Sequence, residues 1–252
     1  MSTTTLSRPA AERSPVGLGR LVQVELRKAV DTRAGLWLML AVAAITIGAA
    51  VLTALVGDDP TVGDVLDNGM QPAGILLPVV GILSVTSEWS QRTALSTFSL
   101  VPARGRVIVA KVLAMSLLAL AAWALAVVAS LGLGAVLGAS GGLQDAPAIL
   151  LQTIVFQVTG MLTGVAFGAA FGSSPVAIVL YFVLPTVLSA VTNLVSALEG
   201  AGRWLDTSQT LAPLTDHALT GAEWARVVTS LALWLVLPLA VGTWRILTRE
   251  VK

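Results

Sequence analysis

The chain has 252 residues, of which 56% are hydrophobic and 12% charged, and its formal net charge is +1. An average soluble domain carries about 25% charged residues, because a globule must cover its outside with polar groups. The composition excludes an ordinary soluble globule and predicts an all-α integral membrane protein. The net charge gives no indication of nucleic-acid binding, and the absence of cysteine excludes disulfides and thiolate metal sites.

Along the chain, residues 1–16 are rich in Ser, Thr, Pro, Ala and Arg, and we expect them to form a disordered cytoplasmic tail. An amphipathic helix is predicted at 17–33, and six long apolar runs follow it, each able to cross a bilayer as a helix. The predicted transmembrane domain covers 34–246, with helices at about 34–56, 71–87, 107–138, 147–171, 175–197 and 227–244. Between and after these helices lie an inner loop at 88–106, an outer loop at 198–226 and a tail at 247–252.

The distribution of charge predicts the orientation. Of the 15 Lys and Arg residues, all except Arg203 and Arg226 fall on one of the two sides that six crossings create. The loops of the other side collect acidic residues, among them Asp58, Asp145 and Glu199. Basic loops stay in the cytoplasm, so we expect both termini to be cytoplasmic in the cell membrane, in a bacterium.

The helix at 17–33 places Leu18, Val22, Leu26, Ala29 and Val30 on one face and Arg20, Gln23, Arg27 and Asp31 on the other. This pattern favours an interfacial helix on the cytoplasmic leaflet, with its arginines near anionic headgroups. The alternative is a cytoplasmic extension of the first transmembrane helix.

The inner loop reads EWSQRTALSTFSLVPARGRVIVAK from Glu88 to Lys111. Ala94, Leu95, Phe98 and Leu100 could give a short helix an apolar side, and Pro102 would end it. Such a helix could dock a soluble partner. The alternative is an ordinary polar turn whose basic residues only follow the positive-inside rule, and the residues alone do not decide between the two.

The order Glu88, Thr93, Pro102, Arg104 and Lys111 resembles the inner loop of type 2 ATP-binding-cassette (ABC-2) exporter permeases, whose pattern is roughly E, T, P-x-x-R and K. The ELRK stretch before the first transmembrane helix and the final GTWRILTREVK are also similar to that family. Ala103 replaces the serine often found before the arginine, which is a small departure.

This resemblance implies that Thr93 to Leu100 form a coupling helix for a separate ATPase subunit and that 17–33 is an elbow helix. The residues assigned to the coupling loop are Glu88, Arg92, Thr93, Leu95, Phe98, Leu100, Pro102 and Arg104, with Glu88 and Arg104 holding its shape. The resemblance also implies short re-entrant helices within Glu199 to Ala225.

Two further sets of residues could serve transport. Gly160, Gly164, Gly168 and Gly172 share one helix face, which predicts either a dimer face or helix packing within one subunit, and the second is favoured. Gln152, Gln157, Thr186 and Asn193 are candidates to line a pathway, although hydrogen bonding between helices is their default explanation.

No G-x-x-x-x-G-K-[ST] phosphate loop, metal-ligand cluster or catalytic triad occurs, so we expect neither an enzyme nor a cofactor in this chain. We also expect no buried Asp, Glu, Lys, Arg or His in the membrane core, since the third apolar run carries only Lys111, near its start; this argues against an ion-coupled carrier. The resulting prediction is the dimeric permease of an exporter for a hydrophobic or amphipathic drug, antibiotic or lipid, with ATP and Mg bound by a separate ATPase. The alternatives are a non-transporting assembly, immunity or sensing partner, and a secondary carrier.

Overall fold

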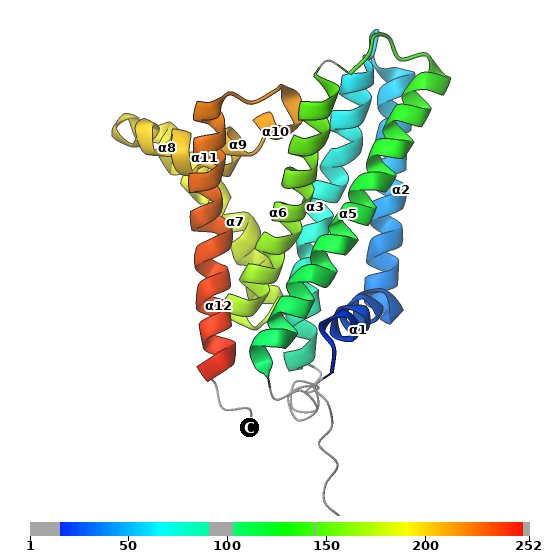
Figure 1. Ribbon diagram of the computed structural model, residues 1–252. Helices are drawn as coiled ribbons and strands as arrows, with labels where there is room; N and C mark the ends of the chain where they lie inside the picture. The colour runs from blue at the N-terminus through cyan, green and yellow to red at the C-terminus, as the bar shows by residue number, and fades with distance from the viewer. Residues whose placement is uncertain (1–15, 91–102, 144, 249–252) are drawn as a thin grey trace, which may run out of the picture.

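A computed structural model describes residues 16–90, 103–143 and 145–248, and most of the described residues lie in helices (Figure 1). In chain order the main helices are α1 (Leu18–Asp31), α2 (Arg33–Val56), α3 (Val62–Ser90), α5 (Arg104–Leu137), α6 (Ala146–Phe171) and α7 (Ser174–Leu194). They are followed by η1 (Ser196–Leu198), α8 (Glu199–Leu205), α9 (Thr207–Thr210), α10 (Pro213–Asp216), α11 (Gly221–Leu231), η2 (Ala232–Val236) and α12 (Leu237–Thr248). The predicted loop residues 91–102 and the predicted terminal tails, except Val16, Leu247 and Thr248, lie outside the described residues.

Six stretches of the described chain are helices long and apolar enough to cross a membrane: α2, α3, α5, α6, α7 and the continuous unit of α11, η2 and α12. Their outer surfaces are apolar as well as their interiors. Val136 is 82% exposed and Leu194 84% exposed. Water would disfavour so many exposed apolar side chains, whereas lipid accepts them. The chain is therefore an all-α multi-pass membrane protein.

The helices pack around α6. Figure 1 shows α2, α3 and α5 on one side of α6, with α7 and the α11–α12 unit on the other. The core is best developed between α3, α5 and α6, where Leu77, Met115 and Met161 are fully buried. The α7 and α11–α12 helices bury little of their surface, so most of their apolar side chains face outward.

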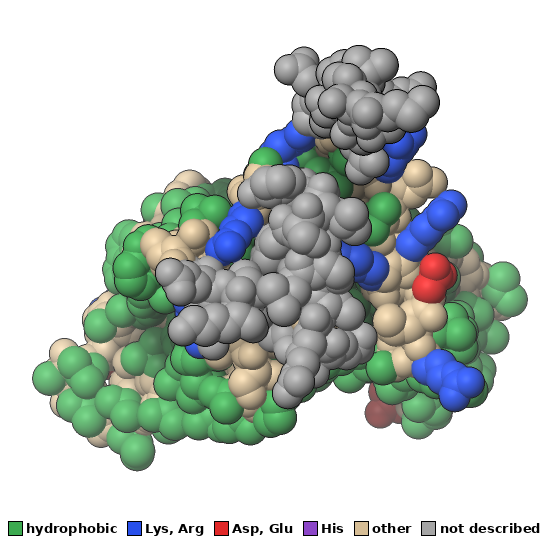
Figure 2. Space-filling view, turned by 90° about the horizontal axis from the view of Figure 1, so that it is seen from below, with side chains coloured by type: hydrophobic (Ala, Val, Ile, Leu, Met, Phe, Trp, Pro, Cys, Tyr) green, Lys and Arg blue, Asp and Glu red, His purple; other side chains and the backbone are tan. Residues whose placement is uncertain are grey.

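Basic and acidic residues lie at opposite ends of this bundle. At one end, which we call the basic end, α1 lies against the starts of α2 and α5 and near the end of α3, and α12 ends on the other side of the bundle (Figure 1). The described basic residues at this end are Arg20, Arg27, Lys28, Arg33, Arg104, Arg106, Lys111 and Arg245. Figure 2 views this end and shows blue Lys and Arg side chains spread across it. The opposite end carries the connections with Asp58, Asp59, Asp145 and Asp216.

Two helices begin earlier than the apolar runs indicated. The second membrane helix was predicted from residue 71 but starts at Val62, because Thr61 caps it: the Thr61 hydroxyl oxygen accepts from the Asp64 N–H, and the Asp64 carboxylate accepts from the Thr61 N–H. The last was predicted from residue 227 but starts at Gly221, where Thr220 and Glu223 form a capping box. Prediction from uncharged runs therefore places the start of a helix too late when its first turn contains a charged residue.

The amphipathic helix α1 packs mainly onto the protein. Ala29 is buried, and Val22 and Leu26 pack against the core cluster that contains Met115. Leu18 and Val30, which were expected on the same apolar face, are instead exposed. The turn to α2 is tight, since a Cβ on Gly35 would collide with the carbonyl oxygen of Ala29.

Short helices occupy the acidic end between α7 and α11, as the resemblance implies. Trp234 of η2 donates from Nε1 to the Leu205 carbonyl oxygen of α8 at 2.7 Å. The indole of Trp234 also stacks on Phe167 of α6, with ring centroids 6.5 Å apart. The last membrane helix thereby holds α8 in place. Whether α8 to α10 enter the membrane stays a prediction.

Candidate functional site: the basic end of the bundle

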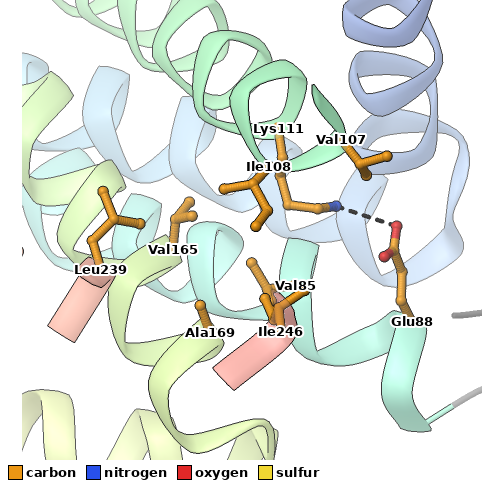
Figure 3. A pocket seen from close by; sticks show the side chains of 9 residues that line it. All are labelled: Val85, Glu88, Val107, Ile108, Lys111, Val165, Ala169, Leu239 and Ile246. Carbon is orange, nitrogen blue, oxygen red and sulfur yellow. Dashed lines mark hydrogen bonds and ion pairs between the residues drawn. The ribbon is translucent and has the colours of Figure 1, made fainter. Parts of the chain in front are cut away.

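Four charged side chains meet at the basic end, and we call them the charge ring: Glu25 and Lys28 of α1, Glu88 of α3 and Lys111 of α5. Lys28 Nζ lies 2.7 Å from Glu25 Oε1 and 2.9 Å from Glu88 Oε1. Lys111 Nζ lies 3.3 Å from Glu88 Oε1, a contact drawn in Figure 3, and also donates to Glu25 Oε2. Each carboxylate thus contacts both ammonium groups, and the signs alternate.

Three of the four side chains of the charge ring are buried. The side chains of Glu25, Lys111 and Glu88 are 4%, 7% and 11% exposed, whereas that of Lys28 is 40% exposed. Lys111 also donates to the Ser84 carbonyl oxygen at 2.7 Å, so its three donors all have acceptors. Two positive and two negative groups leave no net charge, which is what makes burial of the set tolerable.

The α1 members of the ring show the effect of their partners. Burial alone would raise the pKa of the Glu25 carboxyl, but the charge and hydrogen bond of Lys111, together with Lys28, outweigh burial and hold that pKa below its ordinary value. Burial would likewise lower the pKa of Lys28, but its hydrogen bond with Glu25 and the charge of Glu88 raise it. Both groups are therefore charged at neutral pH.

Beside the ring lies a small cavity between α3, α5, α6 and α12. Lys111 and Glu88 stand at its edge, and the rest of its lining is apolar (Figure 3). The other lining residues are Val85, Val107, Ile108, Val165, Ala169, Leu239 and Ile246. Its volume of about 30 Å³ suits one or two water molecules. The cavity is too small for a drug-sized cargo.

Arginine side chains at this end form hydrogen bonds that join α12 to α5 and α6, and α5 to the start of α1. Arg104 Nη1 of α5 donates to the Ile246 carbonyl oxygen of α12 at 3.0 Å, and Arg245 Nη1 of α12 donates to the Ala170 carbonyl oxygen of α6 at 2.6 Å. The last carbonyls of a helix lack partners within it, so Arg245 satisfies an otherwise free acceptor. Arg106 Nη2 donates to the Val16 carbonyl oxygen just before α1 at 2.8 Å.

The structure places two of the predicted coupling-loop residues. Glu88 is in the last turns of α3 and belongs to the charge ring, and Arg104 is the first residue of α5 and contacts α12. The others lie outside the described residues: Arg92, Thr93, Leu95, Phe98, Leu100 and Pro102.

The predicted glycine face lies largely against α3 of the same chain. A Cβ on Gly164 would lie 2.7 Å from the Cα and carbonyl carbon of Pro78, and one on Gly168 would lie 2.9 Å from the Ile82 oxygen. Gly160 is looser, with only Pro78 Cγ at 3.9 Å. Gly172 follows the end of α6 with φ +67°, a conformation that glycine adopts without strain. Gly164 and Gly168 therefore mark a close backbone approach within one subunit.

The predicted pathway residues fall into two groups. Gln152 is buried and donates to the carbonyl oxygens of Leu214 and His217, at 3.3 and 2.7 Å, while its own oxygen accepts from Leu219 N at 2.9 Å. It therefore holds the α10–α11 connection. Gln157 is 1% exposed, with neither amide atom partnered within the described structure.

The second group lies on the exposed side of α7. Thr186 donates to the Phe182 carbonyl oxygen at 2.7 Å, and Asn193 donates to Ser189 Oγ at 3.3 Å. Both side chains are exposed, so they are the two candidates positioned to face a pathway, a second subunit or lipid.

The charges that the helices bury, Lys111 and Glu88, lie at the basic end of the bundle. The signals for the ring were an isolated lysine in an apolar run and an acid, Glu25, on the helical face of α1 that carries Val22 and Ala29. Each is costly to bury alone and requires a partner. Glu25 and Lys111 are 86 residues apart in sequence, and Lys28 and Glu88 are 60 apart, so helical spacing identifies neither of these two pairs.

No protein-family model matches the chain, and comparison with the curated proteins also finds no match. Within residues 16–90, 103–143 and 145–248, no three His, Cys, Asp or Glu side chains are grouped so that they could hold a metal ion.

Proposed function

We propose that this chain is the membrane-spanning permease subunit of an ABC-type exporter, driven by ATP hydrolysis in a separate ATPase subunit. The sequence support is the resemblance to type 2 exporter permeases carried by Glu88, Pro102, Arg104 and Lys111. The structural support is coarser: six apolar membrane helices with an amphipathic helix packed at one end.

The observation that carries the proposal is how the two borders of segment 89–103 are held. On one border, Glu88 belongs to the charge ring, and on the other, Arg104 is bonded to α12 and Lys111 closes the ring. A loop that receives force from a soluble partner must be attached to helices that are held in place, because otherwise the force displaces only the loop. Glu88, Arg104 and Lys111, three residues of the family-like pattern, provide this attachment.

The basic end is, on this proposal, the cytoplasmic face of a bacterial cell membrane, in keeping with the positive-inside rule. Both termini then lie in the cytoplasm. Two copies of the permease, or one copy and a paralogue, would form the pathway, and each would bind one ATPase. The ATPase supplies ATP and Mg binding, because the sequence contains no phosphate loop.

The proposed cargo is a hydrophobic or amphipathic molecule such as a drug, an antibiotic or a lipid. The exposed side of α7 supports this choice, since Val183, Val187 and Leu194 are exposed beside Thr186 and Asn193. Such a surface offers apolar contact with occasional hydrogen bonds and no formal charge.

The bundle buries charge at its basic end, and the way that charge is held disfavours an ion-coupled carrier. Ionisable side chains that relay protons or ions within a membrane protein lie along the transport pathway. The charge ring sits at one end, is neutral as a set, and has all three Lys111 donors occupied. These features favour a structural use of the charges over ion transport.

The test is recovery of an ATPase and ATP-dependent flux. A tagged chain purified from native membranes is expected to bring down a nucleotide-binding subunit, and vesicles containing both are expected to accumulate a lipophilic dye only with ATP. Absence of both would refute the proposal. Flux that follows an ion gradient and ignores ATP would identify a secondary carrier instead.

A substitution in the proposed coupling helix sharpens this test. Phe98→Asp is expected to abolish ATPase co-purification with normal membrane insertion, because it places a charge in an apolar docking contact. The matched control Phe98→Leu keeps the contact apolar and is expected to retain pairing. Unimpaired pairing by Phe98→Asp would refute the coupling role.

A further inference from the structure

The charge ring joins three helices that the chain separates widely. Glu25 and Lys28 come from α1, Glu88 from the end of α3, and Lys111 from the start of α5. The contact of Lys28 with Glu88 joins α1 to α3, that of Glu25 with Lys111 joins α1 to α5, and that of Lys111 with Glu88 joins α5 to α3. Each of the three helices is therefore joined directly to both others.

Stability alone is a poor reason for this ring. Replacing a buried ion network by apolar side chains of similar size is often neutral or stabilising, whereas removing one member leaves an uncompensated buried charge. The surroundings would accept apolar groups, since Val85, Val107 and Ile108 already line the adjacent cavity. Charge at this point provides a fixed geometry that apolar contacts, being non-directional, do not provide.

The ring also has a mechanical connection beyond α1. Thr32 accepts a hydrogen bond from Gly35 N at the start of α2, and Gly35 approaches the backbone of Ala29 too closely to allow a side chain. A displacement of α1 is consequently transmitted to α2, because the turn between the two helices has little space in which to bend.

We propose that the charge ring makes α1, the end of α3 and the start of α5 move as one body, so that a push from the ATPase partner on this end reaches α2 through α1. Glu25 and Lys111 are then positioning residues of coupling and contact neither cargo nor ATPase. The inference rests on the proposed function for its partner, and on the ring geometry alone for the one-body movement.

The test compares two combined variants. The charge-free variant carries Glu25→Leu, Lys28→Met, Glu88→Leu and Lys111→Met, which removes every charge and leaves none unpaired. The exchanged variant carries Glu25→Lys, Lys28→Glu, Glu88→Lys and Lys111→Glu, which keeps the alternation of signs. Exchange of Glu88 and Lys111 alone is the matched control, because it places like charges beside Lys28 and Glu25.

Movement is read from spin labels. The native chain has no cysteine, so Gln23→Cys on α1 and Val109→Cys on α5, both exposed, can be labelled selectively and their separation measured by pulsed electron resonance. We expect one narrow distance distribution with the native ring, a broad one in the charge-free variant and in the single-pair exchange, and narrowing again in the exchanged variant. A narrow distribution in the charge-free variant would overturn the inference.

Coupling is read from the ratio of ATP hydrolysed to dye transported in the reconstituted complex. The charge-free variant is expected to bind the ATPase normally and to raise this ratio about tenfold, a size typical of coupling free energies, with recovery in the exchanged variant. An unchanged ratio would overturn the positioning role. If the unsubstituted chain shows no ATP-dependent flux, the proposed function fails, and the spin-label distances still decide whether the ring holds the three helices together.

Discussion

Replacing Gly164 by alanine tests the close packing of α6 on α3. The added Cβ would lie 2.7 Å from the Cα and carbonyl carbon of Pro78, and ordinary contact begins at 3.4 Å. The helices must therefore separate by more than about 0.7 Å, because the Pro78 carbonyl oxygen lies nearer still to the added Cβ. Overpacking of this kind costs about 1–3 kcal/mol, and the upper end applies because backbone atoms cannot rotate away.

Gly160→Ala is the matched control, since its Cβ would meet only Pro78 Cγ at 3.9 Å. Both substitutions gain roughly 0.5–1 kcal/mol of helix preference, so their difference isolates the clash. The assay is the free energy of unfolding from an SDS titration in mixed micelles, followed by circular dichroism. We expect Gly164→Ala to be less stable than Gly160→Ala, and equal stability would refute the packing argument.

Two predictions concern the acidic end. Gln152→Leu removes the hydrogen bonds to the Leu214 and His217 carbonyl oxygens and the bond from Leu219 N. Leaving such groups unpaired costs about 1–3 kcal/mol each. Amide hydrogen exchange at 214–219 should therefore accelerate, whereas exchange in the core of α6 should not. His217 has a raised pKa because it hydrogen-bonds Glu223 and Asp216, so its contribution to stability is full below its ordinary pKa and is lost as pH rises through the raised value. Proteolysis of the α10–α11 connection should therefore quicken as pH rises above the ordinary histidine pKa of 6.5 and through the raised pKa of His217. His217→Asn should abolish that dependence, and a pH dependence that survives the substitution contradicts the assignment.

The number of membrane helices could be predicted from the sequence because each depends on one local property, an apolar run long enough for the bilayer. The early starts of α3 and of α11 were missed because their first turns contain Asp64 and Glu223. Both starts carry local capping signals, Thr61 with Asp64 and Thr220 with Glu223, which could have been used.

The site was less accessible to sequence reasoning. The sequence shows that Gly164 and Gly168 share a face, but only the fold shows that α3 covers it. Glu25 and Lys111 each signalled a missing partner, yet which charges pair depends on how α1 packs across α5, a contact between distant parts of the chain. Gln152 was read as a pathway candidate, although its hydrogen bonds go to the connection before α11.

The central claim is that the basic and acidic ends of the bundle face opposite sides of the membrane. Because the native chain has no cysteine, Asp58→Cys and Gly105→Cys each provide one thiol, at exposed positions on the acidic and basic ends. A membrane-impermeant maleimide applied to intact cells is expected to label position 58 at once and position 105 only after permeabilisation. Labelling of both positions in intact cells would contradict the account.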